Sequence, residues 1–391
     1  MSFDRIFLIV LDSVGIGELP DADLFHDTGA HTLGHIAERI GGLNVPNLQA
    51  MGLGNIAPLM GVKSVAAPQA HYGKMLESAQ GKDTTTGHWE MMGIEMKTPF
   101  RTYPNGFPER LIQDLSRAIG RGILGNKPAS GTEIIEELGE LHIKTGDAIV
   151  YTSTDSVLQI AAHEDIVSLP ELYEICRTAR ELTLKDEYAI GRVIARPFAG
   201  EPGSFRRTSH RKDYSVKPPE STVMNALVEQ GFESLAIGKI SDIYADEGIT
   251  ESLKTASNRE GVDRLLECMG RNFTGLCFVN LVDFDSQFGH RRDPIGYGRA
   301  LAEFDGRLPE VVRKMGDRDL LIITADHGND PTFRGTDHTR EYVPLLIYHR
   351  RLTKAANLGI RKTFADIGAT VAANFGVNLP TTGTSLLEEI D

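Results

Sequence analysis

The stretch Ile6-Phe7-Leu8-Ile9-Val10-Leu11-Asp12 decides the fold class, because an unbroken apolar run ends abruptly on an acid. A strand with one face in water alternates apolar and polar residues, whereas a continuous apolar run is typical of a strand covered on both faces. A second stretch, Leu320-Leu321-Ile322-Ile323-Thr324-Ala325-Asp326, has the same form. Together the two stretches predict a mostly parallel sheet flanked by helices, and therefore an α/β fold.

Further strands and helices are predicted around these two runs. Apolar β-rich runs predict strands, and helical periodicity between breakers predicts helices. The predicted strands are 6–11, 148–152, 188–195, 234–237, 276–282, 320–324 and 344–348, and the predicted helices are 32–40, 108–119, 132–138, 170–184, 221–230, 299–315 and 364–375.

Two breaker-rich stretches divide the chain into domains. The first is 98–106, which contains Pro99, Pro104 and Gly106, and the second is Lys217-Pro218-Pro219. Such clusters mark loops and linkers. The segment between them has predicted strands and helices of its own, enough for a separate core. We therefore predict a discontinuous core domain, residues 1–100 and 218–391, and an inserted α+β cap domain, residues 101–217.

Composition excludes several classes of function. The 391 residues include 41 Lys+Arg and 54 Asp+Glu, and a formal net charge of −13 disfavours nucleic acid or an anionic membrane as a partner. The apolar runs are far shorter than the roughly 20 residues that cross a bilayer, and no signal-peptide pattern is present. Cys176, Cys268 and Cys277 are too scattered for a disulfide framework or a thiolate zinc site. We expect a cytoplasmic protein with no obligate protein partner.

Acidic residues follow three of the predicted buried strands. Asp12 ends the first run quoted above, Asp326 ends the second, and Asp283 and Asp285 follow the apolar run 276–282. Ligands of open parallel sheets bind outside the carboxyl ends of the strands, so we expect these carboxylates to converge there. Their mutual repulsion calls for cations. A single Asp in such a position is as well explained as a helix N-cap, but three together favour a site.

Three histidines accompany these acids. His290 lies five residues after Asp285, His327 is next to Asp326, and His338 lies in the polar loop 335–339. Carboxylate oxygen together with neutral imidazole is a ligand mixture for Zn, Mn or Fe. Three Asp and three His would serve two metal ions and leave room for a substrate.

The stretch Gly81-Lys82-Asp83-Thr84-Thr85-Thr86-Gly87-His88 places three hydroxyls where we expect the chain to enter a helix. It is not a phosphate-binding P-loop, because the upstream glycine is missing and Asp83 stands where Ser or Thr follows the lysine. Free N–H groups at a helix start stabilise an anion, and a hydroxyl beside a metal ion can act as a nucleophile. A Thr-rich helix N-cap explains the local sequence equally well.

Basic residues are concentrated in the predicted cap. Most arginines in proteins are solvated, but a few in one cluster can hold a phosphate ester by bidentate contacts. The basic residues are Arg192, Arg196, Arg206, Arg207, Arg211 and Lys212, with Lys239 beyond the cap.

Taken together, these strings resemble the alkaline phosphatase superfamily and, within it, the bacterial metal-dependent phosphopentomutases. The resemblance implies an alkaline-phosphatase-like core with an inserted cap, and it extends over nearly the whole chain. The stretches that carry it are 12–17, 81–90, 126–132 (Asn126-Lys127-Pro128-Ala129-Ser130-Gly131-Thr132), 151–162, 191–198, 238–244, 281–294 and 324–344.

The resemblance also implies roles for individual residues. Thr84 matches the threonine that is phosphorylated in the family. One metal ion is implied at Asp12, Asp326 and His327, the other at Asp285, His290 and His338, and both are expected to be Mn²⁺. The implied contacts to a pentose phosphate are Ser153, Asp155, Val157, Arg192, Ile194, Arg207 and Lys239.

The implied reaction moves a phosphoryl group between C1 and C5 of ribose or 2-deoxyribose, an isomerisation that belongs to nucleoside catabolism. It runs through phospho-Thr84 and a sugar bisphosphate, and a bisphosphate such as glucose 1,6-bisphosphate is expected to prime it. Two alternatives stay open. A metal-dependent phosphatase or phosphodiesterase shares the first half-reaction, and a metal-binding scaffold needs Thr84 only as a helix cap.

Overall fold

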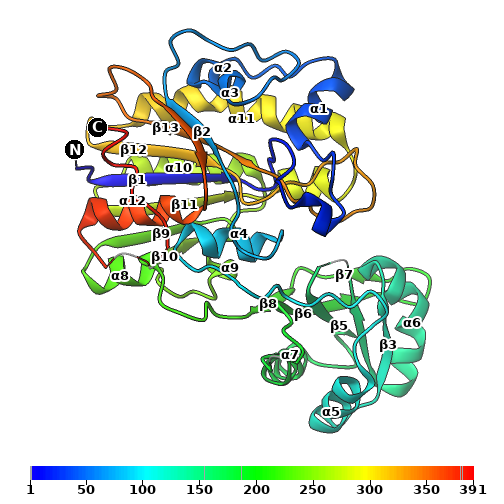
Figure 1. The fold of residues 1–391 in the computed structure, drawn as a ribbon. Helices are drawn as coiled ribbons and strands as arrows, with labels where there is room; N and C mark the ends of the chain where they lie inside the picture. The colour runs from blue at the N-terminus through cyan, green and yellow to red at the C-terminus, as the bar shows by residue number, and fades with distance from the viewer. Residues whose placement is uncertain (1, 154, 186, 379, 381) are drawn as a thin grey trace. The chain divides into compact units, whose positions relative to one another are not determined.

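The computed structural model describes residues 2–153, 155–185, 187–378, 380 and 382–391 (Figure 1). The chain divides into two compact units. The core unit comprises Met1–Pro99 and Pro218–Asp391, and the inserted unit comprises Phe100–Lys217. Each unit has a sheet of its own.

The core unit is built on a mixed sheet. Among the described residues, eight strands pair in the order β10-β9-β11-β1-β12-β13-β2-β14. Neighbours from β10 to β12 are parallel, as are β2 and β14, and only β13 runs antiparallel to both of its neighbours. The predicted α/β fold with a mostly parallel sheet is therefore confirmed. The strands are β1 (Arg5–Leu11), β2 (His71–Met75), β9 (Glu233–Ile237), β10 (Glu251–Leu253), β11 (Gly275–Leu281), β12 (Asp319–Thr324), β13 (Val343–Tyr348) and β14 (Asn357–Arg361).

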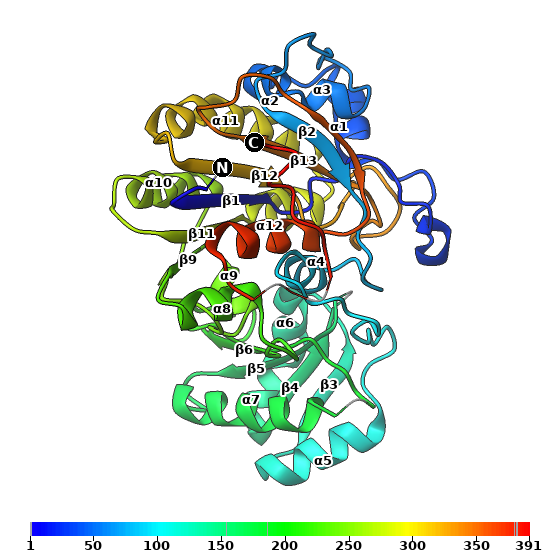
Figure 2. The same cartoon turned by 60° about the vertical axis from the view of Figure 1, so that its left-hand side comes forward.

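Helices cover both faces of this sheet (Figure 2). Successive side chains of a strand point to opposite faces. On β11, Phe278 stacks on the His88 ring of α4, whereas Leu281 would touch a Cβ on Gly261 of α10. One face carries α4 (Thr84–Met91), α8 (Val223–Glu229), α9 (Ile240–Ile243) and α12 (Ala365–Phe375), and the other carries α1 (Thr32–Ile40), α2 (Pro46–Met51), α10 (Asn258–Met269) and α11 (Pro294–Lys314).

Short helical segments complete the core unit. The 3₁₀ helix η1 (Ala22–Phe25) and the helix α3 (Leu53–Ile56) lie in the first part of the chain. A π-helical segment, η2 (Phe284–Gly289), follows β11. No helix within the described ranges is both long enough and apolar enough to cross a bilayer.

The inserted unit is an α+β fold with two apolar cores. Helices α5 and α7 pack on one face of its sheet through residues such as Leu115, Leu172 and Cys176, and α6 packs on the other face through Ile134 and Ile135. The sheet has the order β3-β4-β5-β6-β7, and β8 pairs with β6. The elements are α5 (Glu109–Ile119), β3 (Ile123–Pro128), α6 (Gly131–Thr145), β4 (Ala148–Thr152), β5 (Val157–His163), α7 (Leu169–Thr183), β6 (Arg192–Ala199), β7 (Arg206–Arg207) and β8 (Lys212–Ser215).

Several predicted elements differ from those in the structure. The strand predicted at 188–195 runs from Arg192 to Ala199, and the helix predicted at 132–138 continues to Thr145. The fully buried β5 was not predicted, because Gln159 and His163 interrupt its apolar pattern. Strands β2, β3, β10 and β14 and helix α10 were not predicted either. Three of these strands carry polar or glycine residues that only pairing with a neighbour makes regular.

Candidate metal centre

Three aspartates lie at one edge of the core sheet. The register pairs Leu11 with Leu281 and Val10 with Thr324, so β1, β11 and β12 end at the same level. Asp12 directly follows β1, Asp326 follows β12 after one intervening residue, and Asp285 lies in η2 after β11. A π-helical segment is rare and is often found at a functional site. Here it carries Asp285 at the end of β11.

The first group of possible ligands is Asp12, Asp326 and His327. Their donor atoms all lie within 4.8 Å of one another. His327 Nε2 is 3.6 Å from Asp12 Oδ1 and 3.3 Å from Asp326 Oδ2. Each of the three residues is at most 1% exposed. The structure thus brings together the three residues that the resemblance assigns to one metal ion.

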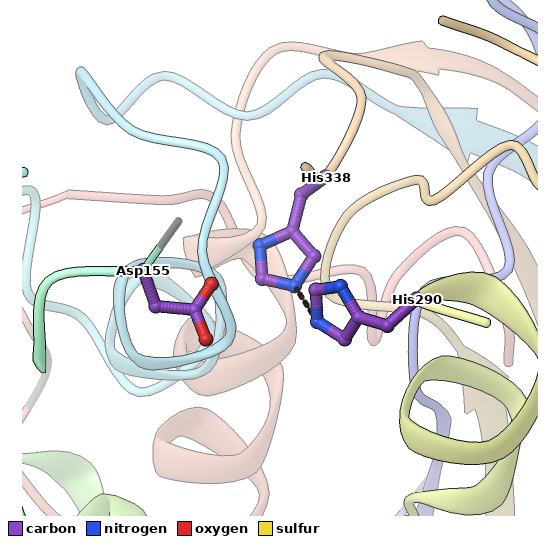
Figure 3. A group of neighbouring side chains, drawn as sticks. All are labelled: Asp155, His290 and His338. Atoms are coloured by element: carbon purple, nitrogen blue, oxygen red, sulfur yellow. Dashed lines mark hydrogen bonds between the residues drawn. The ribbon is translucent and has the colours of Figure 1, made fainter. Parts of the chain in front are cut away.

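The second group contains Asp285, His290 and His338. His290 Nε2 is 3.2 Å from Asp285 Oδ2, and His338 Nε2 is 3.4 Å from Asp285 Oδ1. Figure 3 shows the rings of His290 and His338 joined by a 3.1 Å contact between their Nε2 atoms. His327 also belongs to a set within 4.8 Å with Asp285 and His338. The six side chains therefore form one continuous cluster in which His327 lies between the two groups.

Two buried oxygens show that this cluster suits cations. Asp12 Oδ1 and Asp326 Oδ2 have no hydrogen-bond partner among the described residues. A buried carboxylate oxygen without a partner is costly, and native proteins seldom leave one. A metal ion coordinated by these oxygens and by imidazole nitrogen would remove the cost. The oxygen and nitrogen donor set suits divalent Mn, Zn or Fe.

The electrostatics of the cluster also favour a cation. Burial, together with the charges of Asp326 and Asp285, raises the pKa of Asp12 to about 6. Burial opposes ionisation of Asp285 as well, but His290 and His338 outweigh it and lower its pKa. Because metal ligands must be deprotonated, binding of metal releases protons and weakens as the pH falls.

Thr84 begins α4 beside the first group. The Asp83 side chain caps the helix by accepting from Thr86 N at 3.1 Å. Thr84 Oγ1 lies 3.1 Å from His327 Nε2. Helix α4 approaches the cluster closely because Gly87 has no side chain, and a Cβ there would overlap the carbonyl oxygen of Asp326. The hydroxyl of Thr84 therefore lies within the ligand cluster and at a helix start.

Several residues that sequence reasoning missed hold the ligands in place. Asn280 Nδ2 donates to Asp12 Oδ2 at 2.8 Å, and Asn329 Nδ2 donates to Asp285 Oδ1 at 2.8 Å. His88 Nδ1 lies 3.2 Å from Asp326 Oδ2 and 2.8 Å from the Thr84 carbonyl oxygen. Such partners orient metal ligands. His88 stands four residues after Thr84, on the same helix face, and Asn280 interrupts an apolar strand, so both left a signal in the sequence.

A buried arginine fixes the segment before Thr84. Arg340 is 1% exposed and pairs with Glu77 at 2.8 Å. Its Nη1 also donates to the carbonyl oxygens of Ala79 at 3.0 Å and Gly81 at 2.5 Å. From the other direction, the Glu90 carboxylate accepts from Ala79 N at 2.7 Å. These bonds set the path of the chain into α4.

Of the residues assigned to the substrate, most lie in the inserted unit. Arg192 pairs with Val157 at the start of β5 and β6, and its Nη1 donates to Asp213 at 3.2 Å. Val157 and Ile194 are buried strand residues, while Ser153 and Asp155 lie between β4 and β5. Arg207 differs, because it pairs with Phe198 near the other end of β6.

Lys239 is the one assigned substrate residue in the core unit. It precedes α9 as the N-cap residue and is half-buried. Its positive charge acts to lower the pKa of Asp12, against the stronger effect of burial. The structure thus places Lys239 near the ligand cluster.

The fold and the ligand cluster together define a metal-binding α/β protein. The chain belongs to the Metalloenzyme superfamily, whose family model matches residues 4–379.

Among solved structures, the chain is similar to the PH0037 protein from Pyrococcus horikoshii, at 14% identity and a TM-score of 0.49, covering 96% of this chain and 98% of that one. It is also similar to the phosphoglycerate mutase of Leishmania mexicana, solved at low cobalt concentration, at 11% identity and a TM-score of 0.48, with 98% and 97% covered. The lipoteichoic acid synthase LtaP from Listeria monocytogenes matches at 10% identity and a TM-score of 0.42, with 98% and 75% covered.

Proposed function

We propose that this protein is a phosphopentomutase that interconverts ribose 1-phosphate and ribose 5-phosphate, and the 2-deoxyribose equivalents, in the cytoplasm. The observation that carries the proposal is the position of Thr84 Oγ1, 3.1 Å from His327 Nε2 in a cluster of three Asp and three His. Membership of the Metalloenzyme superfamily supports the metal dependence of the reaction.

The residues of this chain would act as follows. Thr84 carries the phosphoryl group, and its position at the start of α4 stabilises added negative charge. The phosphoryl group passes from the Thr84 oxygen to the free hydroxyl of a sugar monophosphate, which forms a sugar bisphosphate. The bisphosphate turns over and returns its other phosphoryl group to Thr84. A bisphosphate such as glucose 1,6-bisphosphate would supply the first phosphoryl group.

The ligand cluster would hold two divalent ions, proposed to be Mn²⁺, on Asp12, Asp326 and His327 and on Asp285, His290 and His338. Bound there, the ions would supply the positive charge that an in-line phosphoryl transfer needs at its oxygens. Asn280 and Asn329 hold the carboxylates in orientation by donating to Asp12 and Asp285. Lys239 adds a cation near the same cluster.

The inserted unit is proposed to act as a cap that binds the sugar phosphate and keeps water from the phosphothreonine. Ser153, Asp155, Val157, Arg192, Ile194 and Arg207 are its proposed substrate contacts. The arginines distinguish this proposal from a plain hydrolase, because a sugar bisphosphate must be retained while it turns over. A phosphatase or phosphodiesterase would use the same ligand cluster and needs an open path for water.

A product assay separates the mutase from the hydrolase. Protein loaded with Mn²⁺ and primed with glucose 1,6-bisphosphate is incubated with ribose 1-phosphate, and ribose 5-phosphate and free phosphate are measured together. The mutase gives ribose 5-phosphate without an equivalent of free phosphate. Free phosphate as the main product would replace the proposal by the hydrolase, and neither product would favour a scaffold.

Intact mass tests the role of Thr84. The primed wild-type protein is expected to gain one phosphoryl group, and Thr84→Ala is expected to gain none. Thr85→Ala is the matched control, because Thr85 is the next residue of α4 and should leave phosphorylation unchanged. A phosphorylated Thr84→Ala protein would show that another hydroxyl is the nucleophile.

A further inference from the structure

The stretch 126–132, Asn126-Lys127-Pro128-Ala129-Ser130-Gly131-Thr132, has no part in the mechanism above. In the inserted unit it forms the end of β3 and the start of α6. Ala129 N donates to Thr152 O at 3.1 Å, which holds the helix start at the end of β4. The helix has 15 residues, and its first turn includes Gly131 and Thr132. The free N–H groups of a helix start attract anions.

The hydroxyl of Tyr151 lies beside this helix start. The residue is 1% exposed, and its hydroxyl has no hydrogen-bond partner among the residues that the structure describes. A Cβ on Gly131 would lie 2.6 Å from this hydroxyl, so the phenol points at the first residue of α6. Burial raises the pKa of Tyr151, which therefore stays protonated and can donate. A buried donor without an acceptor is costly, and an anion at the helix start would accept its hydrogen bond.

Two arginines with neutral partners lie around this hydroxyl. Arg207 Nη2 donates to Thr132 Oγ1 at 2.8 Å, and its Cζ lies 3.3 Å from the same Cβ position on Gly131. Arg196 Nε donates to Gln159 Oε1 at 3.0 Å. Within the described ranges, neither guanidinium has a carboxylate at ion-pair distance, whereas Arg192 and Arg211 pair with Asp213. The charges of Arg196 and Arg207 both act on the Tyr151 phenol.

This positive charge is unusual for the chain. The protein as a whole has a formal net charge of −13, yet Arg207 donates to the neutral Thr132 hydroxyl beside Tyr151, and the charge of Arg196 is offset only in part, by Asp213. Burial lowers the pKa of Arg196 to about 10, and the charges of Arg211 and Arg207 add to that effect, whereas Tyr151 and Asp213 act against it. An anion that binds between the guanidinium groups of Arg196 and Arg207 would reduce the repulsion between their charges. Thr132 and Arg207 are exposed, so a solute can reach the helix start.

We propose that the Tyr151 hydroxyl, the Arg207 guanidinium and the first turn of α6 bind the phosphate group of a phosphate monoester. The tetrahedral dianion would accept from the phenol, from the planar fork of Arg207 and from backbone N–H groups of the helix start. Thr132 orients the Arg207 side chain, and Arg196 adds charge from β6. Identifying the monoester as a pentose phosphate, held here by the phosphate that is not being transferred, rests on the proposed function.

The site is tested by calorimetric titration of full-length protein from which metal has been stripped with a chelator. Ribose 5-phosphate, ribose and inorganic phosphate are compared as ligands. We expect the two phosphates to bind and ribose not to bind. Tyr151→Phe removes one hydrogen bond to a charged group and should weaken phosphate binding about tenfold, and Arg207→Gln should weaken it at least as much. Inorganic phosphate that competes with ribose 5-phosphate would show that the site recognises the shared phosphate.

Tyr188→Phe is the matched control. Tyr188 also has a buried hydroxyl without a partner in the described part of the chain, but it belongs to the core under α5 and α7, on the other face of the sheet. This variant should bind ribose 5-phosphate like the wild type. Thermal unfolding of each variant shows whether it is folded. If Tyr151→Phe does not fold, Arg207→Gln still tests the site, because Arg207 is exposed and its replacement should leave the fold intact.

Unchanged affinity in Tyr151→Phe and Arg207→Gln, or equal binding of ribose and ribose 5-phosphate by the wild type, would overturn the site. These outcomes differ from failure of the proposed function. A protein without mutase activity that still binds phosphate through Tyr151 keeps the site and loses the mutase. A mutase whose affinity for ribose 5-phosphate ignores both substitutions keeps the function and loses the site.

Discussion

The ligand cluster of the core unit and the arginine cluster of the inserted unit, which consists of Arg196 and Arg207 beside Tyr151, carry charges of opposite sign. The first gathers Asp12, Asp285 and Asp326, and two of its carboxylate oxygens accept no hydrogen bond in the described structure. The second gathers arginines around Tyr151 and leaves a phenol, a donor, without one. Buried acceptors that make no hydrogen bond favour binding of a cation, and buried donors that make none favour binding of an anion. Each region thus indicates the charge of the ligand it is built to bind.

The charges of the two clusters say more about the ligands of this protein than its net charge does. The formal charge of −13 describes the whole chain, but the chemistry lies in local departures from neutrality. A protein selected only for stability would pair these buried groups with one another. Here Asn280 and Asn329 hold the carboxylates of one cluster in place beside its imidazoles, and Thr132 and Gln159 accept from the arginines of the other.

The largest effect is expected when an acceptor is removed from the ligand cluster. Asp326→Asn replaces a buried oxygen, which accepts no hydrogen bond in the described structure, by an amide nitrogen, which cannot bind a cation. Mutation of a residue that hydrogen-bonds to a metal ligand typically weakens metal binding by ~10–100-fold. Loss of the ligand Asp326 itself should weaken metal binding by more than this, and mutase activity should be lost with the metal. Metal content after dialysis and ribose 5-phosphate formation are the two measurements.

Asp283→Asn is the control for this prediction. Asp283 lies two residues before Asp285, but its carboxylate accepts from Asn258 N at 2.7 Å, a structural bond. The control should keep both metal and activity. Wild-type protein that remains fully active after a chelator has removed its metal would contradict the role of the cluster.

The acceptors of the ligand cluster were easier to predict from sequence than the donors of the arginine cluster. Asp12 and Asp326 directly follow apolar runs, and parallel strands end at a common edge, so their meeting follows from strand order alone. The fold class follows from the same runs. Glycine-rich and histidine-rich loops after these strands added His290, His327 and His338 as candidates.

Other features depend on contacts that the sequence does not display. Tyr151 lies in an ordinary apolar run, and only the packing of α6 on β4 directs its hydroxyl toward Gly131. Strand β2 is recognisable as a strand only because it pairs with β13 and β14. The π-helical turn that carries Asp285 was not predicted from the sequence.

In the absence of metal, the free energy of unfolding is expected to depend on pH through Asp12. The pKa of Asp12 is raised by burial and by Asp326 and Asp285, from its ordinary value of 3.8 to about 6. A raised carboxyl pKa favours folding at low pH, where the group is neutral, and this contribution is lost as the pH rises through about 6. Asp12→Asn, which cannot ionise, should therefore be more stable than the metal-free wild type above that pH, by on the order of 3 kcal/mol.

Denaturant unfolding in the presence of a chelator measures this difference. The two proteins should converge as the pH falls toward the ordinary pKa of Asp12, and the order should reverse when Mn²⁺ is added, because only the wild type keeps the ligand. Equal stability of the two metal-free proteins across the whole pH range would show that the fold does not disfavour the ionised form of Asp12.

The smallest effects are expected from two glycine substitutions, one in each cluster. In Gly87→Ala the new Cβ meets the backbone of Asp326, which cannot yield, so α4 must shift and carry Thr84 with it. We expect a loss of about 1–3 kcal/mol in unfolding free energy and slower formation of phosphothreonine. In Gly131→Ala the Cβ meets the side chains of Tyr151 and Arg207, which can move. Its stability should change less, while its affinity for ribose 5-phosphate falls.

Gly306→Ala completes this comparison, because a Cβ at Gly306 in α11 would have no atom of the described structure within 4 Å apart from its own stretch of helix backbone. It should be neutral or stabilising, by up to about 1 kcal/mol, since alanine is the better helix former. Denaturant unfolding, intact mass and phosphate titration of the three variants separate the clusters. Gly87→Ala should affect phosphothreonine and spare phosphate binding by the metal-stripped protein, and Gly131→Ala should do the reverse. If both variants lost both properties equally, the two clusters could not be treated as independent sites with opposite ligands.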